Sequence, residues 1–224
     1  MVAMRSLVYV LLTSIVLIAG CSPTAPTAAV PTNPPLPPTV PSALAAASPS
    51  AGPAVNAPLI ASGPPTAGFV LQSSAFTAGG NLPTQYSCDA PGGGQSPPLS
   101  WSGAPAASRS FALVDQDPDA GGGGSAFTHW VVFNIPPSVT QLDTGLPAGD
   151  SLPNGALQGQ NGRRVTAYQG ACPPAGSPAH HYTFQLFALD GPLPLQAGAS
   201  IVDLQRAMTG HIVGQTQLVA LFGH

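Results

Sequence analysis

Four ionisable side chains stand out in a chain of 224 residues of which only 6% are charged. Asp117 and Asp119 lie in an Asp-Pro-Asp turn. His129 opens the apolar run that follows, and His180 opens a later one. An imidazole donates an N–H to an anion and gains charge beside it, whereas an unpaired carboxylate repels the anion. Asp117 is therefore expected to orient a histidine or to accept a proton from the ligand, and we predict one anion-binding site between the two histidines.

The same residue types permit other chemistry. Two histidines and a carboxylate suit zinc or another metal, but no His-x-x-x-His spacing supports a metal site. A Ser-His-Asp hydrolase is possible by composition, yet the chain has no Gly-x-Ser-x-Gly elbow. We therefore expect a binding protein with no reaction and no cofactor of its own. A hydrolase or metal-dependent enzyme that uses the same aspartates and histidines is the alternative, and a protein-interaction module with a vestigial site is a third possibility.

Strands must position these side chains. Stretches rich in β-branched and aromatic residues predict strands at 69–72, 110–117, 127–135, 182–190 and 215–222. Residues 141–165 are rich in Gly, Asn and Pro and are expected to form a loop. A helix is predicted over Ser200–Thr209, with Ser200 as its N-cap and an apolar stripe through Leu204. Many strands and one helix indicate an all-β sandwich.

Alternation along the strands predicts which residues share a face. His129 is expected on the face of three apolar residues, Val131, Phe133 and Ile135. His180 is expected on the face of four others, Tyr182, Phe184, Leu186 and Ala188. Each histidine would then lie at the end of an apolar face, and the two would open at one rim if the strands share a sheet.

The N-terminal third of the chain does not look globular. Residues 1–20 combine Arg5 with an apolar stretch that is shorter than the roughly 20 residues of a membrane span, which is typical of an export signal. Ala19-Gly20-Cys21 resembles a bacterial lipobox, which implies cleavage before Cys21 and a lipid on its sulfur. Residues 21–67, rich in Pro, Ala, Ser and Thr, are expected to be a disordered tether, and 68–224 the domain. We expect a lipid-anchored, extracytoplasmic protein of the bacterial cell envelope.

The charge distribution excludes one class of partner. The five basic residues are all arginine, the eight acidic residues are all aspartate, and the net charge is −3. Such a chain lacks the basic field that nucleic acid requires, so no nucleic-acid partner is expected.

Five motifs, in this order, resemble those of the phosphatidylethanolamine-binding protein family, most closely its bacterial Raf-kinase-inhibitor-like branch. The motifs are Ser96–Trp101, Asp117–Ala120, His129–Pro136, Tyr168–Pro174 and His180–Phe184. A strand-end histidine or an Asp-Pro-Asp turn is by itself usually structural. Their order and spacing over residues 68–224 are what make the resemblance specific.

The resemblance implies a two-sheet antiparallel β-sandwich with one or two short helices. It also implies a small pocket that accepts phosphate, acetate or a phosphorylated headgroup. Asp117, His129, His180 and Tyr182 would line this pocket, and Gly170 would offer backbone donors. The implied function is binding such a ligand or inhibiting a partner enzyme. Phosphate-type ligands should bind more tightly as pH falls through about 6.5, the ordinary pKa of histidine.

The chain departs from the family pattern at three places. Gly121 follows the Asp-Pro-Asp-Ala segment where the family often has Pro. His181 stands where Arg is common, and residues 161–164 read Asn-Gly-Arg-Arg in place of Asn-Asp-Phe-Gly. The first and third departures concern the rim of the pocket and its selectivity.

Two cysteines remain once Cys21 is assigned to the lipid. In an exported protein, Cys88 and Cys172 are expected to form a disulfide, which would join the loop after the first strand to the segment around Gly170. If both thiols were free instead, Cys172 and His180 would be a candidate nucleophile pair.

Overall fold

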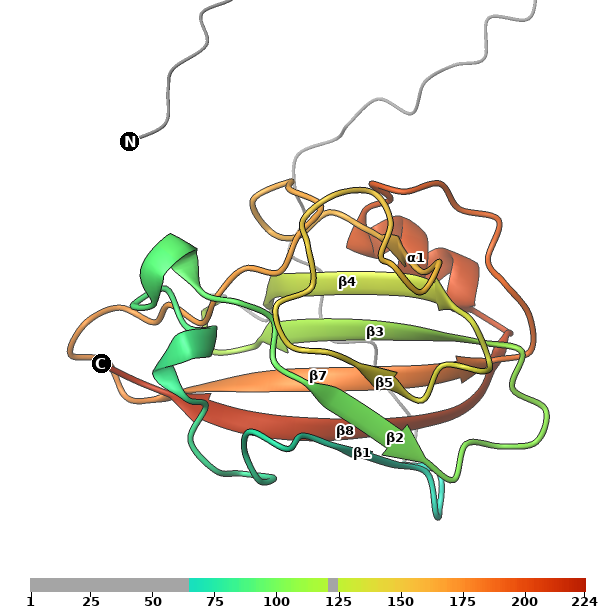
Figure 1. The fold of residues 1–224 in the computed structure, drawn as a ribbon, viewed down its shortest axis with the longest axis horizontal. Helices are drawn as coiled ribbons and strands as arrows, with labels where there is room; N and C mark the ends of the chain where they lie inside the picture. The colour runs from blue at the N-terminus through green and yellow to red at the C-terminus, as the bar shows by residue number, and fades with distance from the viewer. Residues whose placement is uncertain (1–64, 121–124) are drawn as a thin grey trace, which may run out of the picture. The chain divides into compact units, whose positions relative to one another are not determined.

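The computed structural model describes residues 65–120 and 125–224 (Figure 1). The predicted export signal, Cys21, most of the predicted tether and Gly121 lie outside the described residues. Within the described ranges, no helix is both long enough and apolar enough to cross a membrane.

The strands form two antiparallel sheets, as predicted. The larger sheet has the order β6-β4-β3-β7-β8, and the smaller has the order β1-β2-β5. The elements in chain order are β1 (Val70–Gln72), η1 (Thr84–Tyr86), η2 (Pro91–Gly93), β2 (Leu99–Ser102), β3 (Ser110–Asp117), β4 (Phe127–Ile135), β5 (Gln141–Leu142), β6 (Leu157–Gln158), β7 (His180–Leu189), α1 (Ile201–Met208) and β8 (Ile212–Phe222). The segment predicted to be a loop therefore contains two strands, β5 and β6, each of two residues.

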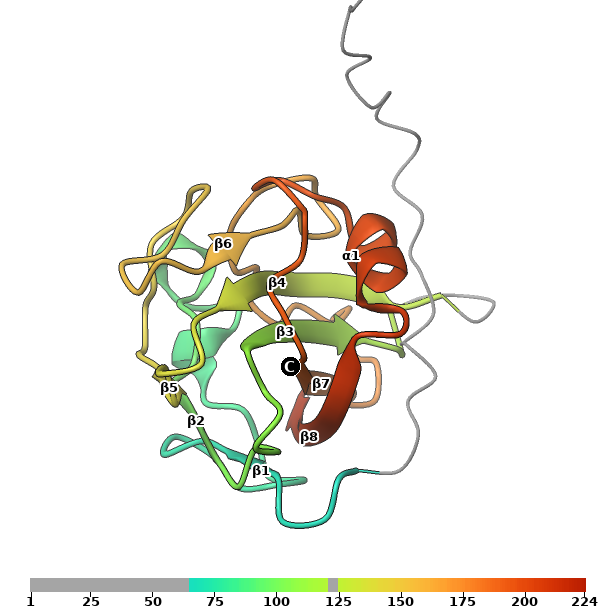
Figure 2. The ribbon, with the colours of Figure 1, turned by 90° about the vertical axis from the view of Figure 1, so that its right-hand side faces the viewer.

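Both faces of the larger sheet are covered, which explains why β3 is buried along its whole length. One face packs toward the smaller sheet in an apolar cluster that includes Trp101, Leu113 and Phe184. The other face packs against α1 through a second cluster that includes Phe133 and Leu204 (Figure 2). A strand buried on both faces reads as a continuous apolar run, because neither of its faces has to be polar.

The helix α1 forms as its sequence predicts. The hydroxyl oxygen of Ser200 accepts the backbone N–H of Asp203 at 3.2 Å, which satisfies one of the donors left open in the first turn. Ile201, Leu204 and Met208 form the buried stripe against the sheet. The helix therefore covers one face of the sheet and leaves the opposite face to the site.

Two irregularities in β4 change which side chains share a face. Asp115 pairs with Trp130 and the next residue of β3 pairs with Thr128, so His129 is an extra residue in β4. A second shift, between the pairs of Phe111 and Leu113, inserts another extra residue near Asn134, whose φ is +54°. A bulge of this kind turns the strand and breaks the alternation of side chains.

The predicted face of His129 is therefore wrong for Val131 and Phe133 and correct for Ile135. Val131 and Phe133 pack on the α1 side, whereas Ile135 packs on the opposite side with Tyr182. His129 contacts the Tyr182 ring, with the two ring centroids 5.1 Å apart. The bulge thus places His129 on the same face as the aspartates and His180, which strict alternation would not have done.

The predicted disulfide between Cys88 and Cys172 is present, with Cα atoms 5.3 Å apart. It joins the segment between η1 and η2 to the segment before β7. Backbone bonds support the junction: Cys88 N–H donates to the Ala171 carbonyl at 2.9 Å, and Ala171 N–H donates to the Tyr86 carbonyl at 3.2 Å. The junction is therefore held by the main chain as well as by the sulfurs.

Candidate functional site

The candidate site lies at the end of the larger sheet where β3 ends and β4 and β7 begin, at the left of Figure 1. The antiparallel pairing of β3 with both neighbours brings these three strand ends together. His180 Nδ1 lies 2.8 Å from Asp117 Oδ2, and both side chains are almost entirely buried. Segments 63 residues apart in sequence thus meet, as the sequence predicted.

Both oxygens of Asp117 have partners. Oδ2 accepts from His180, and Oδ1 accepts the backbone N–H groups of Asp119 at 2.8 Å and Ala120 at 3.0 Å. The two bonds to Oδ1 form an Asx-type turn, which the Asp-Pro-Asp sequence favours. Asp117 therefore orients a histidine, the first of the two roles expected for it.

The His129 imidazole is held by one backbone carbonyl group and by two aromatic rings. Its Nδ1 lies 2.8 Å from the Gln169 carbonyl oxygen, which can only accept, so Nδ1 carries the hydrogen. Phe127 and Tyr182 pack edge to face against the imidazole, with centroids 4.8 and 5.1 Å away. In the neutral ring this tautomer leaves a lone pair on Nε2.

Burial lowers the pKa of His129 below its ordinary value of 6.5, and this is the largest effect on the group. The bond to Gln169 and the Asp117 carboxylate oppose it in part. The positive charge of Arg163 lowers the pKa further. His129 is therefore neutral at pH 7 in the unliganded domain.

Tyr182 completes this face. Burial is the main reason why its pKa is raised, and the Asp117 carboxylate adds to the effect. The hydroxyl lies close to Asp117 and to the backbone of Cys172, but it makes no well-aligned hydrogen bond within the described part of the chain. The phenol therefore stays protonated and retains a donor for another group.

Asp115 is a buried carboxyl group that the sequence analysis did not single out. Its side chain lies two residues before Asp117 on the same face, opposite Trp130 and Phe184 of the neighbouring strands. Neither carboxyl oxygen has a hydrogen-bond partner within the described residues. Burial raises the pKa of Asp115 well above its ordinary value of 3.8, and the neighbouring Asp117 carboxylate raises it further. An aspartate that directly follows four consecutive apolar residues, 111–114, was the available signal.

Asp119 and His181 form a second, exposed pair. Asp119 Oδ2 accepts the backbone N–H of His181 at 2.7 Å and lies 2.8 Å from its Nδ1. What little burial there is would raise the pKa of Asp119, but the two hydrogen bonds from His181 outweigh it and lower the pKa. His181, which stands where the family commonly has Arg, therefore ties the Asp-Pro-Asp turn to the start of β7.

Gly170 has a steric role in this structure. A Cβ there would lie 2.4 Å from the Gly93 carbonyl oxygen and 2.7 Å from the Ser87 carbonyl carbon. Only a glycine lets the segment before β7 approach the η1–η2 region this closely. The predicted role of Gly170 as a backbone donor to a ligand stays a prediction.

Residues 161–164, whose sequence departs from the family pattern, also lie at the site. Asn161 is buried, and its side-chain oxygen accepts the backbone N–H groups of Arg163 at 2.9 Å and Val165 at 3.1 Å. A Cβ on Gly162 would lie 2.6 Å from the Phe127 ring, so the loop packs directly on the strand that carries His129. Arg163 is thereby brought close enough to act on His129, which sequence reasoning missed.

The residues considered for a metal do not converge at this rim. Among the described residues, ligand atoms of three or more His, Cys or acidic side chains come together only at Cys88, Cys172 and His224. The Asp117 oxygens are already engaged, and Asp119 pairs with His181. The rim geometry therefore favours hydrogen bonding over metal ligation.

Fold and site together define a two-sheet β protein with a buried aspartate–histidine pair and a second buried histidine at one sheet end. The family model described as "Phosphatidylethanolamine-binding protein" matches residues 72–223. The chain belongs to this family, as the motifs predicted.

Relatives and solved structures agree with this assignment. A UPF0098 protein of Methanothermobacter thermautotrophicus is 45% identical over 152 residues, which cover 68% of this chain and 97% of the relative. LppC of Mycobacterium tuberculosis, whose name proposes a lipoprotein, is 41% identical over 157 residues, 69% of this chain and 72% of LppC. The crystal structure of Escherichia coli YbcL, titled as a member of the mammalian PEBP family, has a TM-score of 0.65 and 33% identity, over 70% of this chain and 99% of YbcL.

Proposed function

We propose that the domain binds a small anionic or phosphorylated ligand between His129 and His180. The observation that carries this proposal is the way both rings are held. Each histidine uses Nδ1 inside the domain, His180 toward Asp117 and His129 toward the Gln169 carbonyl. Each Nε2 therefore remains for a ligand, in a ring whose direction is fixed in advance.

The charged and polar groups around the two histidines favour an anionic ligand over a neutral one. The Asp117 carboxylate is already matched by two backbone N–H groups and His180, so its repulsion of an anion is reduced. Protonation of His129 would add an N–H at Nε2 and a positive charge in a buried environment, where a charge-assisted hydrogen bond is strong. The Tyr182 hydroxyl and Arg163 are further donors near the same ring.

The pH dependence follows from the lowered pKa of His129. An anion that prefers the protonated ring raises this pKa on binding, so affinity falls as pH rises between the unliganded and liganded values. Because the unliganded pKa lies below 6.5, affinity should keep increasing as pH falls past 6.5. This places the expected window lower than the sequence alone suggested.

Calorimetric titration tests the proposal. Inorganic phosphate is the first probe, and sulfate is the second because its charge stays constant from about pH 5 to about pH 8. His129→Ala and His180→Ala should each weaken phosphate binding about 10- to 100-fold, the value of one charge-assisted hydrogen bond. His211→Ala, which removes an exposed histidine paired with Asp190, is the matched control and should leave the affinity unchanged.

Two results would contradict the proposal: equal phosphate affinity in all three variants, or sulfate affinity that does not change with pH. The alternative of a hydrolase or metal-dependent enzyme at the same residues is tested in parallel. A panel of esters and phosphoesters, with and without zinc, would have to show turnover that His129→Ala abolishes. Modulation of a partner enzyme stays a prediction of the family resemblance.

We further propose that the mature chain is a lipoprotein anchored through Cys21 at the bacterial cell envelope. The lipobox-like end of the predicted export signal supports this, and so does the name of the relative LppC. Mass spectrometry of the mature N-terminus should find a chain that begins at acylated Cys21. An intact Met1 or an unmodified Cys21 would disprove the anchor without affecting the ligand proposal.

A further inference from the structure

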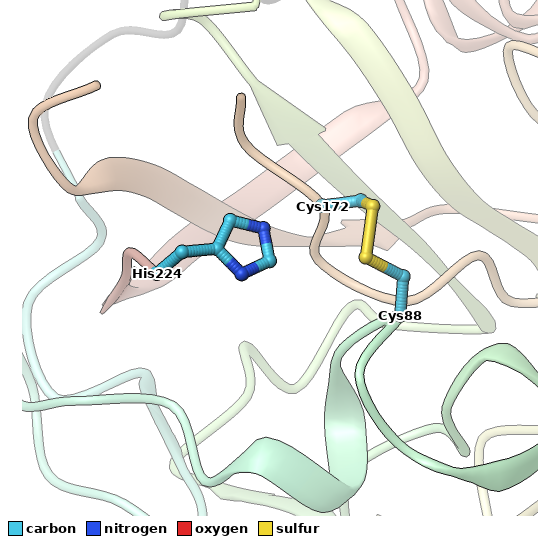
Figure 3. A group of neighbouring side chains, drawn as sticks. All are labelled: Cys88, Cys172 and His224. Atoms are coloured by element: carbon cyan, nitrogen blue, oxygen red, sulfur yellow. A yellow bond between two sulfur atoms is a disulfide. The ribbon is translucent and has the colours of Figure 1, made fainter. Parts of the chain in front are cut away.

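A second group of potential metal ligands consists of the two disulfide-bonded cysteines and His224. Cys88, Cys172 and His224 place their potential ligand atoms within 4.8 Å of one another (Figure 3). Cys88 is half-buried, and Cys172 and His224 are exposed, so the group is open to solvent. Zinc prefers thiolate and imidazole ligands of this kind.

The imidazole of His224 is already oriented toward the sulfurs. Its Nδ1 lies 3.2 Å from Asp89 Oδ2, and the Phe222 ring packs edge to face against it at 5.7 Å. Figure 3 shows the ring pointing toward the two cysteines. A carboxylate on one ring nitrogen that leaves the other for the metal is the usual support of a zinc-bound histidine.

The main chain would keep the two cysteines close after the sulfur–sulfur bond is broken. Ser87 and Ala171 form a parallel bridge, and Cys88 N–H donates to the Ala171 carbonyl at 2.9 Å. The absent side chain of Gly170 permits this approach, since a Cβ there would meet the Ser87 and Cys88 backbone. The main-chain positions of both cysteines are thus held by contacts that do not depend on the disulfide.

We propose that reduction of the Cys88–Cys172 disulfide creates a zinc site formed by both thiolates and the His224 imidazole. A dithiol reductant supplies two electrons and two protons, is itself oxidised to a disulfide, and leaves two protein thiols. Zn²⁺ then forms two Zn–S bonds and one Zn–N bond, and the two thiol protons pass to solvent. Water occupies the fourth position of the tetrahedron. The intact disulfide has no anionic sulfur, so the oxidised protein should not bind the metal.

Cobalt provides a spectroscopic probe for this site. The full chain carrying Cys21→Ala, which removes the third thiol, is reduced, freed of reductant without air, and titrated with Co²⁺ and then Zn²⁺. The reduced chain should bind about one equivalent of Co²⁺ with thiolate-to-cobalt charge-transfer and tetrahedral d–d bands, and Zn²⁺ should displace it. The oxidised chain should give neither band.

Variants assign the ligands. His224→Ala should weaken Zn²⁺ binding at least tenfold, and Asp89→Asn should weaken it about 10- to 100-fold, as loss of a supporting carboxylate does. His211→Ala removes a similarly exposed histidine that also pairs with an aspartate, Asp190, and should leave the affinity unchanged. Cys172→Ser leaves one thiolate, so both the Co²⁺ affinity and the intensity of the charge-transfer bands should fall.

Two measurements of folding accompany the metal titration. Circular dichroism confirms that the reduced chain is folded, and Zn²⁺ should raise the thermal midpoint of the reduced chain and not that of the oxidised chain. The proposal is overturned if the reduced chain binds no Co²⁺ or unfolds so that metal binding is lost. It is equally overturned if His224→Ala binds as tightly as the His211→Ala control.

Discussion

At the scale of single residues, the site is built from side chains whose polar atoms are almost all engaged, with few exceptions. Asp117 uses both oxygens, and His129 and His180 each use Nδ1. Besides the Nε2 atoms of the two histidines, the exceptions are the Tyr182 hydroxyl and the Asp115 carboxyl group, which are buried and make no well-aligned hydrogen bond within the described residues. Buried polar groups without partners are uncommon, so these two make the sharpest residue-scale predictions.

Tyr182→Phe should separate binding from stability. The hydroxyl makes no well-aligned hydrogen bond to the part of the domain that the structure describes, so its removal should leave the free energy of unfolding unchanged or slightly higher. If the hydroxyl donates to the ligand, phosphate affinity should fall about two- to tenfold, the value of one neutral hydrogen bond. Urea unfolding and calorimetric titration measure the two quantities.

Tyr168→Phe is the matched control. Its hydroxyl donates to the Tyr86 carbonyl at 2.8 Å, so this variant should lose about 1 kcal/mol of stability and keep its phosphate affinity. The reverse pattern in the two variants would contradict the assignment of Tyr182 to the ligand.

Asp115→Asn should change how stability depends on pH. The ordinary Asp pKa is 3.8, and burial raises the pKa of Asp115 in the folded chain. Unfolding then releases a proton at pH values between these two, so the folded chain loses stability as pH rises through that window. Asn cannot ionise, so the variant should gain on the wild type as pH rises above 3.8, by about 1.4 kcal/mol for each unit of the shift.

Urea unfolding at several pH values measures this difference. A constant offset between Asp115→Asn and the wild type at every pH would show that Asp115 is not a buried acid with a raised pKa.

Much of the residue-scale site could be predicted, because its members are polar types in an apolar chain. Asp117, His129, His180 and Tyr182 lie together as the motifs suggested. Arg163 and Phe127 were not foreseen, because their proximity to His129 comes from a loop packing on β4. Such packing is not encoded in the spacing of either residue from the histidine.

At the scale of secondary-structure elements, the bulge in β4 decides where His129 points. The sequence predicted the bounds of β3 and β4 correctly, because long runs of β-forming residues mark them. It did not predict the two extra residues in β4, and strict alternation therefore put His129 on the face of Val131 and Phe133, which pack on the opposite side. The strands β5 and β6 were missed because two residues show no periodicity.

The two faces of the larger sheet should respond independently to mutation. Leu204 of α1 is fully buried among Val131, Phe133 and Phe187, on the face away from the site. Leu204→Ala should therefore cost about 2–5 kcal/mol of stability by leaving a cavity. Phosphate affinity should stay within about twofold of the wild type, because distant and independent positions are energetically additive.

Denaturant unfolding and titration below the unfolding transition test this separation. A large loss of affinity in folded Leu204→Ala would mean that the α1 face is coupled to the site.

At the scale of the whole molecule, one covalent bond closes a loop between residues that are 84 positions apart. Replacing both Cys88 and Cys172 by Ser should lower the free energy of unfolding by about 2–5 kcal/mol, because the unfolded chain gains conformational entropy. The same double variant should bind no Co²⁺, which links this measurement to the proposed zinc site. An unchanged urea midpoint would mean that the main-chain contacts alone determine the stability of this junction.

The family and the two-sheet fold could be predicted from the sequence because ordered motifs constrain the whole chain path. The position of His224 beside the disulfide could not, because nothing in the C-terminal sequence specifies which loop it meets. The pairing of Cys88 with Cys172 was predictable only because few cysteines were available.

In the proposed function, one ligand contacts both buried histidines. Nitrogen-resolved NMR of the imidazoles during a phosphate titration can show whether it does. The Nε2 signals of His129 and His180 should shift together along one saturating curve, while those of exposed His211 stay in place. Signals of His129 and His180 that stay unchanged at saturating phosphate, or that follow two different curves, would contradict it.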